Sequence, residues 1–194
     1  MERRALDRLL SAAGAVMALV LLIGGVLALV GHNFATSQVR DQLVQEKVFF
    51  PPKGPALDAK EFPGLQQYAG QQVDTGVKAK AYADQYIWEH MMSASGGKTY
   101  SEISTEARAN PDNTELAALK TTLFQGDMLR SSLLTAFAFS QFAVIALWGG
   151  IVMLVGAALL ALLSLLGFRH AARVSANEWL GGASVEIPTA RSNA

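Results

Sequence analysis

Few residues of this chain have the type and spacing that catalysis requires. His90 follows Glu89, and a histidine next to a carboxylate is the minimum for an acid–base pair. Adjacent residues of a helix point about 100° apart, however, and such a pair needs a third group to orient it. We therefore expect His90 to be a surface or interface histidine, and we predict no catalytic residue.

A second candidate is Gly97-Lys98-Thr99, which matches the end of a phosphate-binding loop. The full loop requires a glycine five residues before Gly97, where this chain has Met92. The same segment fits a helix end at Gly96 and Gly97, followed by a capping box in which Thr99 and Glu102 begin a short helix near Ser101. With no cysteine for thiolate ligands and only 3 histidines, we predict no metal and no cofactor.

The composition describes the molecule that must position these residues. Hydrophobic residues make up 51% of the 194 and charged residues only 16%, which is too apolar for an ordinary soluble domain. The 16 basic residues balance the 16 acidic ones, so the net charge is zero and no strongly basic face for nucleic acid is expected.

Two long uncharged stretches predict membrane-spanning helices. The first lies between Arg8 and Arg40, and residues 9–30 form its apolar centre, close to the ~20 residues that cross a bilayer. The second covers residues 131–168, where a helix enters and spans the membrane from about Phe142. Two buried helices of a soluble protein are the alternative, but soluble helices normally carry a polar face. A cleaved signal peptide would have a shorter apolar region.

Flanking charges predict the orientation. Arginines precede the first span and follow the second, so the positive-inside rule places residues 1–8 and 169–194 in the cytoplasm of a bacterial cell. Residues 31–130 are then extracytoplasmic. The predicted fold is mainly α: a two-helix transmembrane hairpin with an inserted, mostly helical domain that contains a Pro/Gly-rich loop.

Local signals divide the predicted extracytoplasmic domain. A stalk helix is expected to reach about Lys47 and to end at Pro51-Pro52. A turn-rich loop then runs to Gly76, and a helix covers residues 77–95. The aromatic residues expected to anchor the loop are Phe49, Phe50, Phe62 and Tyr68.

The last helix is predicted to begin at Asn110-Pro111, with asparagine as N-cap and Pro111 as the first helical residue. We expect it to continue into the second span, with Gly126 as a point where it could bend.

Two sets of residues are candidates for interfaces. Small residues four apart allow transmembrane helices to approach closely, either each other or a partner. This set consists of Gly14, Ala18, Gly24, Ala28, Ala146, Gly150, Ala157 and Ala161. Outside the spans, exposed aromatic residues mark protein interfaces, although packing against the Pro-rich loop is the alternative. This second set consists of Tyr82, Tyr86, Trp88 and His90.

Two short motifs carry a family resemblance. Residues 96–102 follow a helix that contains His90, and residues 128–133 lead into the second span. In both respects the chain resembles a family of small actinobacterial two-span proteins, many of which are labelled aromatic ring-opening dioxygenases. In size and layout it is also similar to accessory subunits of the actinobacterial respiratory supercomplex that joins cytochrome bc to cytochrome oxidase.

The dioxygenase label implies a non-haem iron held by two histidines and a carboxylate. The predicted topology places His170 across the bilayer from His32 and His90, so we expect no such centre. We instead predict a non-catalytic accessory subunit of a larger integral membrane complex, with cytochrome bc and oxidase subunits as the partners that the resemblance implies. The alternative is a free-standing receptor or sensor that binds a ligand outside the membrane.

Overall fold

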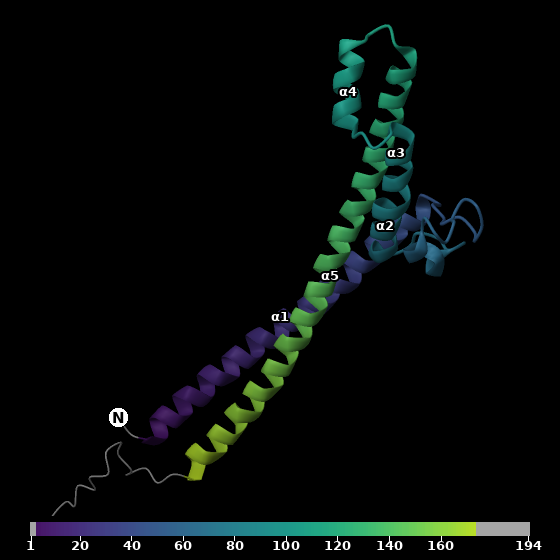
Figure 1. Ribbon diagram of the computed structural model, residues 1–194. Helices are drawn as coiled ribbons and strands as arrows, with labels where there is room; N and C mark the ends of the chain where they lie inside the picture. The colour runs from purple at the N-terminus through teal and green to yellow at the C-terminus, as the bar shows by residue number, and fades with distance from the viewer. Residues whose placement is uncertain (1–2, 174–194) are drawn as a thin grey trace, which may run out of the picture. The chain divides into compact units, whose positions relative to one another are not determined.

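The computed structural model describes residues 3–173, and these residues are mainly helical. The predicted tail after Arg173 lies outside the described residues. The elements, in chain order, are α1 (Arg3–Gln45), the 3-10 helix η1 (Pro63–Tyr68), α2 (Gly76–Ala81), the π-helix η2 (Tyr82–Ile87), α3 (Trp88–Ser95), α4 (Tyr100–Ala109) and α5 (Thr114–Arg173) (Figure 1). Within this part of the chain the only β pairing is two isolated bridges, so the predicted α class is confirmed.

The chain divides into two compact units, and each of the two long helices contributes to both. Residues 3–29 and 147–173 form what we call the terminal unit, and residues 30–146 form the middle unit. Both long helices contain an 18-residue window with a mean hydropathy of 2.7, of which 11% is buried. The structure therefore has two helices that are long and apolar enough to cross a membrane.

In the terminal unit, α1 and α5 run antiparallel, since Gly14 faces Ser164 and Gly25 faces Gly150. Most other apolar side chains point outwards. Leu19 is 56% exposed and Val152 69%. Such a surface suits a hydrocarbon solvent better than water.

The core of the middle unit is built from the Pro/Gly-rich loop and the helices around it. Its largest fully buried side chains are Phe50, Leu57, Leu65, Val73, Ile103 and Leu123. Figure 1 shows α4 folded back along the start of α5, where the rings of Tyr100 and Phe124 lie 5.6 Å apart. One core therefore joins residues that are more than 70 positions apart in the sequence.

The end of α1 lies close to its predicted position but has a different cause. The helix ends at Gln45, and Lys47 then takes a left-handed conformation with φ of +51°, its N–H donating to the Val44 carbonyl. The chain has thus left the helix before it reaches Pro51. The prediction that Phe49 anchors the loop is wrong, since its side chain is 52% exposed.

The helix predicted over 77–95 is confirmed as a continuous helical segment from Gly76 to Ser95. Its middle part, η2, is π-helical, which the sequence did not indicate. Gly96 ends the segment with φ of +63°, as predicted, and Gly97 is also left-handed at +85°.

The predicted start of the last helix is wrong. Asn110 ends α4, and Pro111 lies in the turn that follows. Asn113 begins α5, because its side-chain oxygen accepts the Leu116 N–H at 2.9 Å. From there α5 runs unbroken through Gly126, where the absent side chain leaves room for Met91.

Candidate functional site

The predicted aromatic set lies where the loop meets the helical segment 76–95. Tyr82, Tyr86 and His90 are spaced four residues apart and stack along one face, with ring centroids 4.9 and 4.3 Å apart. Phe50 contacts Tyr82 at 5.1 Å, and Phe62 contacts Tyr86 at 5.6 Å. Tyr82 and Tyr86 thus pack against the Pro-rich loop, which was the alternative to an exposed protein interface. Burial also raises the pKa of Tyr82, and the neighbouring Tyr86 adds to the shift.

His90 is exposed at the end of this stack and its ring makes structural contacts. Its Nδ1 donates to the Tyr86 carbonyl at 2.8 Å, and the ring stacks on Phe62 at 5.7 Å. A small polar pocket of about 130 Å³ adjoins it, lined by Glu61, Phe62, Glu89, His90 and Ser93. Among residues 3–173, no three histidine, aspartate or glutamate side chains converge as metal ligands.

A polar cluster formed by Lys80, Asp84, Trp88 and Arg130 joins the helical segment 76–95 to α5. Asp84, in the π-helix, accepts from Lys80, one turn earlier, and from Arg130 Nη2 at 2.8 Å. These two cations hold the pKa of Asp84 below its ordinary value, Lys80 contributing most. The Arg130 guanidinium also lies 4.8 Å from the centre of the Trp88 ring. We call this the Asp84–Arg130 cluster.

In the sequence, Arg130 lies next to the uncharged stretch 131–168 and within the motif 128–133, and neither pattern predicts a contact for it. Its partner is 46 residues away, so no local spacing indicates the pair. Trp88, a predicted interface residue, is half-buried and lies against this arginine. The cluster therefore links two helical segments of the middle unit that are far apart in the sequence.

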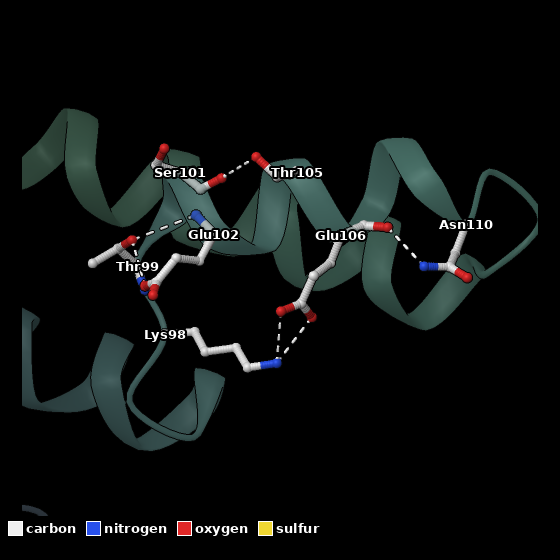
Figure 2. A network of polar contacts seen from close by, with 7 residues as sticks. All are labelled: Lys98, Thr99, Ser101, Glu102, Thr105, Glu106 and Asn110. Atoms are coloured by element: carbon white, nitrogen blue, oxygen red, sulfur yellow. Dashed lines mark hydrogen bonds and ion pairs between the residues drawn. The ribbon is translucent and has the colours of Figure 1, made fainter.

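The segment Gly97-Lys98-Thr99, which matches the end of a phosphate-binding loop, connects α3 to α4 (Figure 2). The capping box is complete: the Thr99 hydroxyl accepts the Glu102 N–H, and the Glu102 carboxylate accepts the Thr99 N–H at 2.8 Å. The carboxylate also accepts the Thr99 hydroxyl at 2.8 Å, and these two hydrogen bonds, above all the one from the Thr99 N–H, lower the pKa of Glu102. Lys98 pairs with both oxygens of Glu106, at 2.7 and 2.9 Å. Lys98 thus ties the junction to α4.

Several of the small residues in the two spans face each other within the terminal unit. Ala18 and Ala157 are buried, and a side-chain carbon placed on Gly14 would lie 2.5 Å from Ser164 Oγ. The close approach to a backbone atom of the other helix, however, is at Gly25, which the pattern missed. A carbon there would lie 2.8 Å from Leu154 Cγ and 3.1 Å from the Gly150 carbonyl oxygen.

A side-chain carbon placed on Gly24 would meet only the Met153 sulfur, at 3.3 Å. Ala28 contacts the position of Gly150, and Ala161 is exposed. Ala146 belongs to the middle unit and is half-buried. The small residues therefore serve contacts within the chain at some positions and remain accessible at others.

The described residues bring together structural contacts rather than a nucleophile, a base and a group to orient them. Three grooves between α1 and α5 remain open. One of about 240 Å³ lies in the middle unit, and two, of about 470 and 320 Å³, lie in the terminal unit. Comparison of the chain with protein-family models, with curated proteins and with solved structures finds no match.

Proposed function

We propose that this chain is a two-span membrane protein whose two ends lie in the cytoplasm and whose residues 31–130 lie outside the bilayer. The low burial of both apolar windows supports this arrangement, because the core helices of a soluble protein would bury most of such a surface. The flanking arginines support the orientation.

Within that arrangement, we propose that the protein is a non-catalytic accessory subunit of a larger membrane complex. The groups capable of chemistry in the middle unit are held by structural contacts. His90 binds the Tyr86 carbonyl, Asp84 holds Arg130, and Glu102 caps α4. A subunit that stabilises a complex requires a rigid unit and a docking face, not a reactive group.

One observation carries the proposal: α5 exposes two large apolar side chains on one face in the middle unit. Phe124 is 49% exposed and Met128 54%. On a helix, residues four apart share a face, so Phe124 and Met128 lie next to each other. Phe and Met are enriched in protein interfaces, and we call these two residues the α5 patch.

The partner is expected to be an integral membrane complex, since both spans would place this chain beside it in the bilayer. The layout of the chain resembles accessory subunits of the supercomplex that joins cytochrome bc to cytochrome oxidase. A respiratory complex is therefore the first partner to test.

The test is purification of the tagged protein from its native membrane in mild detergent, with mass spectrometry and a haem spectrum of the eluate. We expect stoichiometric cytochrome subunits with the wild type and a loss of most of them with a Phe124→Gln, Met128→Gln double variant. Phe49→Gln is the matched control, because it removes an exposed aromatic residue from another part of the middle unit. Equal recovery with all three proteins would contradict the α5 patch as the docking face.

The receptor alternative has one observation in its favour. The groove of the middle unit has apolar walls that include Leu43, Val73 and Leu133, and its edge carries the polar side chains of Gln42, Glu46 and Ser132. Apolar walls with a few polar groups are typical of small-molecule sites. A colourless eluate that contains only this chain would favour the receptor.

A further inference from the structure

The largest of the three grooves lies in the terminal unit, between α1 and the end of α5. Its buried floor consists of small side chains, Ala18, Ala157 and Ser164. Larger side chains line it at the exposed edge, where Leu22 is 47% exposed and Phe168 40%. No charged side chain lines it.

In a bilayer this groove would face hydrocarbon. The groove is open on one side and has a volume of about 470 Å³. At roughly 30 Å³ for each water-sized group, it has room for ~16 methylene groups, which is the size of one lipid chain. Since burial of each methylene is favourable by dispersion and shape matching, a single acyl chain is the occupant that fits both the medium and the volume.

Charge at one end of the groove indicates the kind of lipid. Arg8 precedes the groove residue Ala15 by seven positions, and Arg169 follows the groove residue Leu165 by four. Both spacings keep residues on one helix face, so each arginine continues one wall of the groove beyond its apolar part. Both arginines are exposed.

Two of the other titratable groups at this end lie in a separate pocket. Asp7 and His170 line that pocket together, with 4.0 Å between the carboxylate and the His170 Nε2. Arg4 is half-buried. Arg173 is exposed one turn beyond Arg169, so positive charge predominates at this end of the groove and matches an acidic headgroup.

We propose that this groove binds one acyl chain of an acidic phospholipid, whose phosphate lies beside Arg8 and Arg169. The proposal requires that the chain spans the bilayer, but it does not depend on a protein partner. The lipid would come from the leaflet on the side of the two chain ends. It would fill a gap that the two helices leave between them and fix their distance on that side.

Native mass spectrometry of the full chain in mild detergent tests this proposal, with phosphatidylglycerol and phosphatidylcholine as probes. We expect the wild type to retain one phosphatidylglycerol molecule and to bind phosphatidylcholine more weakly. Ala158→Leu with Ala161→Leu fills the groove at two exposed positions and should abolish retention of both lipids. Ala13→Leu is the matched control, since this alanine is exposed and lines neither pocket of the terminal unit.

The variants Arg8→Gln and Arg169→Gln distinguish the contribution of the lipid headgroup to binding from that of the acyl chain. Each should lower the preference for phosphatidylglycerol by about fivefold and leave the binding of phosphatidylcholine unchanged. Equal lipid retention by the wild type and by the filled-groove variant would overturn the proposal. So would a wild type that holds no lipid, which is the result expected if the groove receives a partner's helix instead. An unchanged preference in both arginine variants would overturn the acidic headgroup.

Discussion

Removal of Arg130 should loosen the helical segment 76–95 from α5. In the Asp84–Arg130 cluster, the guanidinium makes an ion pair with Asp84 at 2.8 Å and a cation–π contact with Trp88 at 4.8 Å. Asp84 and Arg130 are both 29% exposed, so the pair is partly screened by solvent. Ion pairs of this kind contribute 0.2–1 kcal/mol and cation–π contacts about 0.5–1 kcal/mol. We therefore expect Arg130→Gln to cost about 1–2 kcal/mol.

Hydrogen exchange of the full-length protein in detergent measures this loss where it occurs. A cost of about 1–2 kcal/mol corresponds to roughly 5- to 30-fold faster exchange of the amides in residues 76–95. Peptides from α4 serve as the internal reference, since the partners of the guanidinium, Asp84 and Trp88, both lie outside α4. A double-mutant cycle with Asp84→Asn then isolates the ion pair. If Arg130→Gln has the same effect in the Asp84→Asn background, the two residues are not coupled and the reasoning is wrong.

The pH dependence of the same effect has a definite sign. The pKa of Asp84 lies below its ordinary 3.8 because Lys80 and Arg130 stabilise the carboxylate. A lowered folded-state pKa gives stability that is present above the unfolded value and is lost as the pH falls through the folded value. The difference between the wild type and Asp84→Asn should therefore be constant from neutral pH to about 4 and shrink below that.

Three further substitutions test local features. Thr99→Ala removes the acceptor for the Glu102 N–H and should cost about 1 kcal/mol, seen as faster amide exchange at the start of α4. Gly96→Val places a β-branched residue at φ of +63° and should cost about 1 kcal/mol or more, whereas Gly96→Asn should cost less, as measured by resistance to proteolysis at this junction. Gly25→Leu should separate the two helices of the terminal unit more than Gly24→Leu, because only Gly25 has backbone within 3.1 Å, and crosslinking yield across the pair reports the difference.

Features set by a few neighbouring residues were the predictable ones. The Thr99–Glu102 box and the left-handed Gly96 follow from local backbone needs, and the structure has both. Asn110-Pro111 satisfies the same rules for a helix start, but Asn113 lies only three residues later and begins the helix instead. Local signals therefore indicate that a helix begins here, but they do not show which of two asparagines three residues apart is its N-cap.

Contacts that depend on the rotation of a helix about its axis, or on residues far apart in the sequence, could not be predicted. Gly24 and Gly25 are neighbours in the sequence, yet they point about 100° apart, and only the packed pair of helices shows which one faces Gly150. The partner of Arg130 depends on how 46 intervening residues fold. The π-helix that carries Asp84 leaves no signature in residue type that the pattern rules recognise.

The length of the uncharged stretch in α5 gives an independent reason to expect a partner. Its 38 residues extend about 57 Å as a helix, whereas the hydrocarbon layer is about 30 Å thick. In the middle unit, the chain itself covers one side of this excess, since Gly76 lies against Phe137 and His32 donates to the Ala143 carbonyl. The opposite side still exposes Phe139 by 57% and Phe142 by 65%. Headgroups can accept the aromatic rings nearest the bilayer. The α5 patch precedes the uncharged stretch, with Met128 about 20 Å along the helix from Phe142. We expect a protein surface to cover Phe139 and the α5 patch, and the Phe124→Gln, Met128→Gln variant tests the patch.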